Sequence, residues 1–230
     1  MENQKNKKLL EAYRNMPTGN ISDAMYKLGL PSGVIIDGPK PIETRQPRMV
    51  GYACTVQQMP RHQSAEEEKL AKHLDVMNSI AQSGDVVVID VGGRKDVCTG
   101  GSMIALRAQL RGISGLVVNG CFRDIAEVIN TKFPLFCTGF TPIKSVPLLE
   151  TVGINIPVVI GGIQIKPGDL IVGDDTGIVV IPVNKAEEVL KVAQKIQKVE
   201  EKIVKHIQEG IDYKECRKLA EAEVAAEENI

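Results

Sequence analysis

The sequence predicts an α/β protein whose sheet is buried on both faces, and three observations carry this prediction. Residues 85–90 (DVVVID) and 115–118 are apolar almost throughout, which is typical of strands covered on both sides. A glycine-bearing turn and a helical pattern follow each of them, over residues 103–111 and 124–130, as in parallel sheets. Residues 184–209 carry an apolar stripe at helical spacing, which predicts a long C-terminal helix.

The elements that precede the first of these strands are predicted in the order helix, helix, strand, helix. The ranges are 6–15, 21–28 (ended by Gly29), 49–57 and 64–82, with a turn at 18–20 and a loop over 31–47. Ser64 and Glu67 have the spacing of a capping box, in which side chains bind the free amides of a helix start. Residues 91–101 are predicted as a loop and Asn119-Gly120 as a turn, because glycine marks turns.

The second half of the chain is predicted to be rich in strands before it ends in helices. Four short strands are expected over residues 134–137, 158–160, 169–172 and 178–181. Asn184 and Glu187 fit a capping box for the long helix, Gly210 its end, and residues 212–230 a polar helical tail. A helix of about 26 residues, roughly 39 Å long, packs either on a neighbouring subunit or across its own sheet. Residues 1–230 are interpreted as one domain, with N-terminal helices in 1–30 and C-terminal helices in 184–230.

Composition excludes several classes of function. The chain has 230 residues, with 28 basic and 29 acidic side chains, no Trp and 3% aromatic residues. It lacks the basic excess that nonspecific nucleic-acid binding needs and the aromatic residues on which single strands stack. Five cysteines without a CxxC pair argue against a zinc site or a disulfide framework and favour a reducing compartment.

The start of the chain and its hydropathy predict a cytoplasmic protein without membrane contact. The first fifteen residues, MENQKNKKLLEAYRN, are polar and charged, unlike a signal peptide. No window reaches the eighteen or so apolar residues that a membrane span requires.

Two glycine-bearing turns are candidate functional sites. Thr99-Gly-Gly-Ser102 precedes a helix, whose free amides at residues 102–105 suit a carboxylate or phosphate, although such a turn is often only a connection. In the second turn, Arg123 offers a planar fork for a carboxylate, and Asp124 offers oxygen ligands of the kind that divalent cations prefer. Asp124 and Glu127 also have capping-box spacing, so a purely structural role stays open.

Other polar residues are weaker candidates. Glu200 lies about 60° from the centre of the stripe on the long helix (100° per residue), so it either reaches a metal across that surface or is simply solvated. Asp174-Asp175-Thr176-Gly177 fits a turn between strands better than a cation site. Lys144 is a conceivable Schiff-base amine with nothing nearby to lower its pKa. His62, His73 and His206 have no metal or triad spacing.

The chain resembles the RraA-like family, which includes class II 4-hydroxy-4-methyl-2-oxoglutarate aldolases. The likeness is carried by TGNISDAMYKLG (18–29), GDVVVIDVGG (84–93), RGISGLVVNGCFRDIAEV (111–128), INIPVVIGGIQIKPGDLIVGDDTGIVVIP (154–182) and AEEVL (186–190). The resemblance implies an α-β-β-α sandwich with a central swivelling-type β unit. It also implies trimers or hexamers with active sites between subunits.

The same resemblance implies roles for individual residues. Arg123 and Asp124 match the catalytic pair of the family, with Asp124 as a ligand of Mg²⁺ or Mn²⁺ and Arg123 on the pyruvyl part of a small 2-oxo acid. Residues Gly101, Ser102, Met103 and Ile104 would present amides to the substrate carboxylate. Glu200 matches the acidic residue that an adjacent subunit donates to the metal site. The implied activity is a carbon–carbon lyase that cleaves a 4-hydroxy-2-oxo acid or decarboxylates oxaloacetate.

Ser102 departs from the pattern of the aldolases, which carry an acidic residue at this position, 21 positions before the arginine. Serine holds a water but adds no negative charge, so a weakened lyase is expected. The alternative is a noncatalytic protein-binding regulator of an RNase E-type ribonuclease, which the family also contains. The intact Arg123-Asp124 pair argues for the enzyme.

Overall fold

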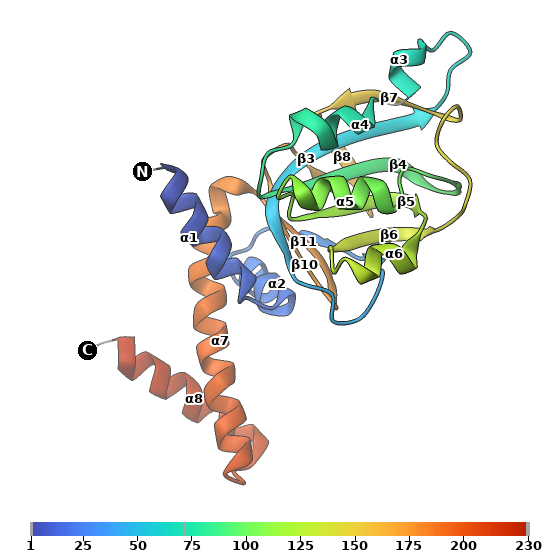
Figure 1. Ribbon diagram of the computed structural model, residues 1–230. Helices are drawn as coiled ribbons and strands as arrows, with labels where there is room; N and C mark the ends of the chain where they lie inside the picture. Colours follow the sequence, from blue (N-terminus) through green and yellow to red (C-terminus); the bar gives the residue numbers. More distant parts are fainter. Residues whose placement is uncertain (1, 71, 229–230) are drawn as a thin grey trace.

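The fold is built around one curved mixed sheet with helices outside it (Figure 1). The computed structural model describes residues 2–70 and 72–228. In these residues the main sheet has the strands β1 (Val34–Ile35), β2 (Lys40–Pro41), β3 (Met49–Pro60), β4 (Asp85–Cys98), β5 (Gly115–Phe122), β6 (Leu135–Phe140), β7 (Leu149–Ile154), β10 (Leu170–Asp174) and β11 (Gly177–Ile181). A separate hairpin pairs β8 (Val158–Ile160) with β9 (Ile163–Ile165).

The strand order is β1-β11-β10-β3-β4-β5-β6-β2, and β7 pairs with the second half of β3. The centre β3-β4-β5-β6 is parallel, whereas the pairs on either side of it are antiparallel. The carboxyl ends of the parallel strands therefore lie together at one edge. Turns that follow β4 and β5 are brought side by side there.

Helices cover both outer faces of the sheet. Their bounds are α1 (Glu2–Arg14), α2 (Thr18–Lys27), α3 (Glu67–Leu70), α4 (His73–Asp75), the π-helix η1 (Val76–Ile80), α5 (Ser102–Leu110), α6 (Ile125–Asn130), the 3₁₀ turn η2 (Val183–Lys185), α7 (Ala186–Gln208) and α8 (Tyr213–Glu228). Figure 1 shows α5 and α6 in front of the parallel strands, and α1, α2 and α7 beside β10 and β11.

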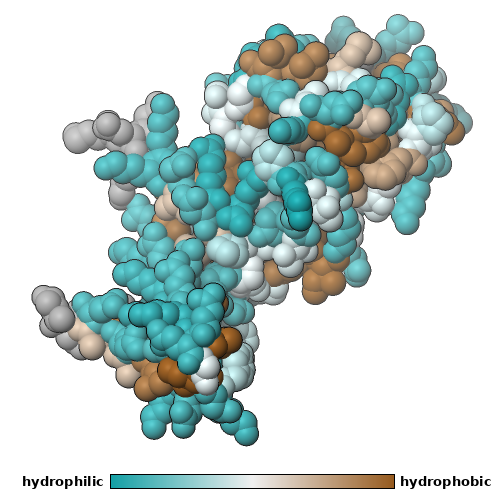
Figure 2. All heavy atoms as spheres, turned by 60° about the horizontal axis from the view of Figure 1, so that its bottom comes forward, coloured by the Kyte–Doolittle hydropathy of each residue, from teal (hydrophilic) through white to brown (hydrophobic). Residues whose placement is uncertain are grey.

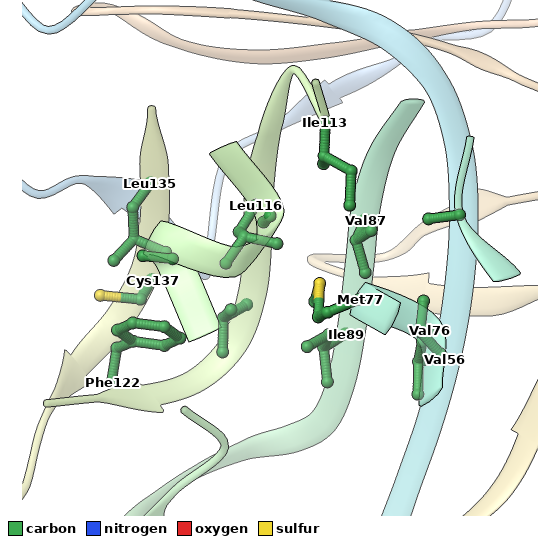
Figure 3. Close-up of a cluster of buried hydrophobic side chains, with 14 of the residues drawn as sticks. Val56, Val76, Met77, Val87, Ile89, Ile113, Leu116, Phe122, Leu135 and Cys137 are labelled. Atoms are coloured by element: carbon green, nitrogen blue, oxygen red, sulfur yellow. The ribbon is translucent and has the colours of Figure 1, made fainter. Parts of the chain in front are cut away.

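Alternating side chains of the strands enter two different cores. Val87 and Ile89 of β4 pack outward with Met77 of η1 (Figure 3). Val86 and Val88 point to the opposite face, into a central core that they share with residues of β8, β9, β10 and β11. Because both faces of β4 are buried, its sequence is apolar without alternation.

A third core lies outside β10 and β11, where Val172 and Val179 contact residues of α1, α2 and α7. The layers are thus helices, sheet, central core, sheet and helices. This confirms the predicted α/β class and the α-β-β-α sandwich.

The long C-terminal helix is confirmed, and it has two different halves. The first half of α7 packs on its own sheet through Val189, Ala193 and neighbours. The second half leaves the sheet and pairs with α8 (Figure 1). Lys202 lies 3.0 Å from Glu223 and 2.8 Å from Glu227 across this helical pair. Figure 2 shows this extension as mostly hydrophilic, with a hydrophobic patch near its end.

Both predicted capping boxes are wrong. The helix after Ser64 starts only at Glu67, and the Ser64 amide instead donates to His62 Nδ1. The long helix starts at Ala186 after a 3₁₀ turn, without a side-chain cap. No described helix is long and apolar enough to cross a membrane.

The helix predicted over residues 64–82 is divided into α3, α4 and η1, and residue 71 lies outside the described residues. The Ala81 amide donates to the Val76 carbonyl, five residues back. This wider turn brings both Val76 and Met77 into the core, which a regular helix does less well. Packing against β4 therefore overrides the local helical pattern.

Three predicted turns or loops belong to regular elements. The turn at 18–20 starts α2, and the Asn119-Gly120 turn is part of β5, with Asn119 paired to Asp90. A Cβ on Gly120 would lie 2.1 Å from Val91 Cγ2, so this glycine serves close packing. The loop at 91–101 is strand as far as Cys98, with register shifts after Asp90 and Arg94. The short strands β1, β2, β7 and β9 were not predicted.

Candidate functional site

The two glycine-bearing turns meet at the carboxyl edge of the parallel strands. The Thr99 amide donates to the Cys121 carbonyl at 3.0 Å, and the Arg123 amide donates to the Gly100 carbonyl at 3.1 Å. These backbone bonds fix the start of α5 beside the end of β5. The side chains that sequence analysis placed in separate segments are therefore neighbours.

Asp124 reaches across from one turn to the other. Its backbone has φ 56° and ψ 44°, and it makes no side-chain cap on its own helix α6. Its Oδ2 instead accepts hydrogen bonds from the Ser102 amide at 3.2 Å and the Ser102 hydroxyl at 3.3 Å. The alternative of a capping box with Glu127 is therefore wrong. Left-handed backbone costs free energy in a residue other than glycine and is enriched at functional sites.

Arg123 stands beside this carboxylate. Its Nε lies 3.8 Å from Asp124 Oδ2, and the two side chains are 38% and 39% exposed. Gly101 makes room for both, because a Cβ there would lie 2.4 Å from Asp124 Oδ2 and 2.9 Å from Arg123 Cγ. A cation and an anion are thus held side by side, within reach of solvent, at the start of α5.

The pair lines a cavity of about 380 Å³, within the range of small-molecule sites. Its walls come from α4 and η1, from the end of β4, from α5 and from the loop that precedes β7. The lining residues are His73, Leu74, Met77, Asn78, Cys98, Thr99, Gly100, Gly101, Met103, Ile104, Arg107, Arg123, Asp124, Lys144, Ser145 and Val146. The surface of this cavity is mostly apolar.

His73 and Lys144 line this cavity, although their sequence spacing gave no sign of it. His73 is 2% exposed, and burial lowers the pKa of its imidazole to about 4. Lys144 is exposed. Sequence analysis did not place His73 in a site, because residues 64–82 have the pattern of an ordinary surface helix.

Glu200 lies elsewhere in the chain. It accepts a hydrogen bond from Asn20 Nδ2 at 2.6 Å and lines a groove of about 390 Å³ between α2, α7 and α8. Figure 1 places α7 well away from α5 and α6. Within one chain Glu200 is therefore not brought to Asp124, and its predicted role in the metal site of an adjacent subunit stays a prediction.

This turn offers a divalent ion few protein ligands, so most of the ion's ligands would be waters or substrate oxygens. Among the described residues there is no group of three or more His, Cys, Asp or Glu side chains arranged to hold a metal. Asp124 supplies one carboxylate, whose Oδ2 is already bonded to Ser102. Mg²⁺ is compatible with this set, because it keeps several waters and takes one or two carboxylates together with substrate oxygens.

Asp174, by contrast, is a structural residue. Its carboxylate accepts hydrogen bonds from the amide and hydroxyl of Thr18 at 3.0 and 2.7 Å, and from the Thr176 amide at 2.9 Å. The interpretation of residues 174–177 as a turn between strands is confirmed.

Comparison with known proteins gives a consistent result. A family model described as RraA-like (Aldolase/RraA) matches residues 18–180. A protein of Halalkalibacterium halodurans named "Putative 4-hydroxy-4-methyl-2-oxoglutarate aldolase" is 39% identical over 185 residues, 80% of this chain and 81% of that protein.

Two solved structures share the fold. An uncharacterized protein from Pseudomonas syringae has a TM-score of 0.83 at 32% identity, covering 93% of this chain and 94% of that one. Streptomyces coelicolor RraAS2, described as an unusual member of the RNase ES inhibitor RraA protein family, has a TM-score of 0.74 at 30% identity. The match covers 84% of this chain and 94% of RraAS2.

Relatives differ in length. The Legionella pneumophila protein DlpA is 30% identical over 210 residues, but the chain spans only 33% of its length.

Proposed function

The chain belongs to the RraA-like family, and on this premise we propose that it is a divalent-metal-dependent carbon–carbon lyase that releases pyruvate from a 2-oxo acid. Its substrates would be a 4-hydroxy-2-oxo acid, oxaloacetate, or both. The observation that carries the proposal is the Arg123-Asp124 pair, held at the start of α5 and open to a cavity of about 380 Å³.

Arg123 would bind the pyruvyl end of the substrate. Its guanidinium donates in a planar fork that matches a carboxylate and the neighbouring oxo group. Of the amides at residues 101–104, those of Ser102 and Ile104 are already bonded, to Asp124 Oδ2 and the Gly101 carbonyl. In the described part of the chain the Gly101 and Met103 amides have no such partner, so they would be the ones to donate to the substrate carboxylate.

Both reactions pass through the enolate of pyruvate, and Arg123 would stabilise its negative charge. Asp124 would hold Mg²⁺ or Mn²⁺, which supplies further stabilisation of that charge as a Lewis acid. Ser102 holds the Asp124 carboxylate in place through its amide and hydroxyl. It brings no charge of its own, so a lower rate is expected than with a carboxylate at this position.

An adjacent subunit would complete the site. Glu200 lies in a groove on α7 whose floor includes Val192, Ile196, Val199 and Ile203. We propose that a second copy packs on this groove in a trimer or hexamer, so that Glu200 of one subunit approaches Asp124 of the next. The Glu200 carboxylate would then be a second protein ligand of the metal, beside Asp124.

The test is release of pyruvate by purified protein given Mg²⁺ or Mn²⁺ with oxaloacetate or with 4-hydroxy-4-methyl-2-oxoglutarate. We expect turnover above that of the free metal ion, and its loss in Asp124→Ala and Arg123→Ala. Turnover that stays at the level of free metal, with no effect of Asp124→Ala, would refute the proposal.

A second candidate function is noncatalytic regulation of an RNase E-type ribonuclease, favoured by the likeness to RraAS2 and by Ser102. Its test is binding of the purified chain to such a ribonuclease. Tight binding that Asp124→Ala does not weaken, without metal-dependent release of pyruvate, would favour the regulator.

A further inference from the structure

Two arginines of α5 bind the π-helix η1, which forms another wall of the cavity. Nε of Arg107 donates to Asn78 Oδ1 at 3.1 Å. Nη1 of Arg111 donates to the Asn78 carbonyl, and its Nη2 donates to the Ala81 carbonyl at 3.0 Å. Arg107 and Arg111 are four residues apart and therefore lie on one face of α5. Hydrogen bonds from both arginines thus join α5 to η1.

The wall that η1 forms is anchored by packing on one side only. Val76 and Met77 enter the core beneath it, whereas Asn78 and Ser79 are exposed. The chain that leads to this wall, over residues 61–69, is exposed almost throughout. Single π-turns are rare and are found mostly at functional sites. The position of the wall relative to α5 therefore depends in large part on the two arginines.

The same helix α5 also holds the proposed catalytic carboxylate. At the start of the helix, the Ser102 amide and hydroxyl donate to Asp124 Oδ2. Farther along the helix, Arg107 lines the cavity, as do Met77 and Asn78 of η1. Because α5 is bonded to both sides, it sets the distance between the Asp124 carboxylate and the η1 wall.

We propose that Arg107 and Arg111 are positioning residues of the lyase, which set the width of the cavity by holding η1 against α5. The inference rests on the proposed function and adds to it, because α5 would fix both the pair that binds the reacting carbonyl and the wall that packs on the substrate tail. Arg107 acts through the Asn78 side chain, and Arg111 acts through the carbonyls at the end of η1. Neither arginine takes part in the chemistry.

A displaced wall changes the binding of the substrate more than its conversion. The wall offers Leu74 and Met77 to the tail of the substrate, whereas the charge of the enolate develops beside Arg123. Contacts with the tail are alike in the ground state and in the transition state, so their loss raises KM and leaves kcat unchanged. A merely structural role of the arginines would instead lower Tm and the fraction of active enzyme, and hence kcat, without a change of KM.

The experiment compares Arg107→Met with Arg107→Gln. Methionine matches arginine in length as far as Nε but has no donor, whereas glutamine places its Nε2 donor near the position of Nε and carries no charge. The substrate, with Mg²⁺, is whichever of oxaloacetate and 4-hydroxy-4-methyl-2-oxoglutarate the wild type turns over. We expect KM to rise about threefold in Arg107→Met, from the loss of one exposed hydrogen bond, with kcat within about twofold of the wild type. Arg107→Gln should restore KM to near the wild-type value.

Variants of the partner groups complete the test. Asn78→Leu removes the acceptor of Arg107, so the double variant Arg107→Met/Asn78→Leu should raise KM no more than the larger of the two single effects. Arg111→Met removes two hydrogen bonds from a charged donor and should raise KM about tenfold. Gln109→Leu is the matched control: Nε2 of Gln109 donates to the Thr131 carbonyl at the end of α6, outside the cavity, so KM should stay at the wild-type value.

The outcomes distinguish this inference from the proposed function. Metal-dependent turnover with an unchanged KM in Arg107→Met and Arg111→Met, whether or not Tm falls, overturns the positioning role and leaves the lyase intact. Equal rises of KM in Arg107→Met and Arg107→Gln would mean that the guanidinium charge itself binds the substrate, and they would overturn the positioning role of Arg107. If neither compound yields pyruvate above the free metal, the lyase itself fails, and the positioning role fails with it.

Discussion

Asp124 and Asp174 both lie in turns at strand ends, but their carboxylates are used differently. Asp174 is 15% exposed and accepts three hydrogen bonds, two from Thr18 at the start of α2 and one from Thr176 in its own turn. Asp124 is 39% exposed and lies beside the Arg123 guanidinium, and within the described residues its carboxylate accepts hydrogen bonds only from Ser102, through Oδ2. Both oxygens of the Asp174 carboxylate accept hydrogen bonds within the fold. Oδ1 of Asp124 accepts none among the described residues, so it is available to a ligand.

The backbone differs in the same way. Asp124 has a left-handed conformation, which costs on the order of 1 kcal/mol in a residue other than glycine. Asp174, the last residue of β10, is not among the residues with positive φ. This combination of strain and unused hydrogen-bonding capacity supports the proposed binding role of Asp124, whereas the hydrogen bonds of Asp174 serve the fold. Four measurements test this difference between Asp124 and Asp174.

The largest effect is expected for Asp124→Asn. Asparagine tolerates the left-handed backbone and still accepts from Ser102, so the fold is retained. Loss of the negative charge should lower metal-dependent release of pyruvate by at least about 100-fold, with a change in Tm of no more than about 2 °C. A variant that unfolds, or that keeps its activity, would mean that Asp124 is no different from Asp174.

The next effect is on stability, for Asp174→Ala. It leaves the Thr18 amide and hydroxyl and the Thr176 amide without an acceptor, so we expect the free energy of unfolding to fall by about 3 kcal/mol. Urea denaturation measures it. Activity per folded molecule should stay unchanged, and a selective loss of activity would contradict the structural role.

A change of pH separates the two regions in a third way. The pKa of His73, lowered by burial to about 4, lies below its ordinary value near 6.5, so the native state resists a proton that the unfolded state binds. The contribution of neutral His73 to the free energy of unfolding is complete above about pH 6.5 and is lost as the pH falls toward 4. Unfolding should therefore be easier by about 2 kcal/mol at pH 5 than at pH 7, and His73→Phe should remove this difference.

The contribution of Asp174 to the free energy of unfolding should not change between pH 7 and pH 5. Burial raises the pKa of Asp174, but the hydrogen bonds from Thr18 and Thr176 and the nearby Arg48 outweigh it and hold the pKa below its usual value. The stability it contributes is present above about pH 4 and is lost only in stronger acid. If the free energy of unfolding falls by the same amount from pH 7 to pH 5 in the wild type and in His73→Phe, the pH effect does not come from His73.

The smallest effect is expected for Gly101→Ala. Its Cβ would displace the flexible side chains of Asp124 and Arg123, so activity should fall about tenfold while stability changes by less than about 1 kcal/mol. Gly19→Ala in α2, where a Cβ has no heavy atom within 4 Å, is the matched control and should keep full activity. Equal activity of both variants would show that the exact placement of the pair is unimportant.

Sequence alone predicted an α/β fold with a sheet buried on both faces and the residues of the turn, whereas the α-β-β-α layers came from the resemblance to the RraA-like family. The apolar runs of β4 and β5 require burial on both faces, and Arg123-Asp124 follows the end of β5 by simple order along the chain. It could not decide between a cap and a binding role for Asp124. The structure excludes a cap on α6, because the Asp124 carboxylate bonds Ser102. Ser102 lies 22 residues away in the sequence, and strand pairing brings it near.

Other parts of the fold were beyond local patterns. The π-turn at Val76 exists because two adjacent side chains enter one core. Asn119-Gly120 is strand because Asn119 Nδ2 donates to Asp90 Oδ1 at 2.7 Å. Each depends on a neighbour distant in sequence, so no window of the chain contains the cause.

The pairing of β4 with β5 has a consequence for how this protein tolerates change in length. Asp90 pairs with Asn119, Arg94 with Gly120 and Cys98 with Cys121, so β4 carries three extra residues on each side of Arg94, the first three passing through Gly92 and Gly93 with φ 68° and 72°. Since the register is fixed at these three pairs, the exposed residues between them, Gly92 and Lys95-Asp96, can gain or lose neighbours without shifting Arg123. Insertions and grafted peptides should therefore be tolerated there without displacing Arg123 and Asp124.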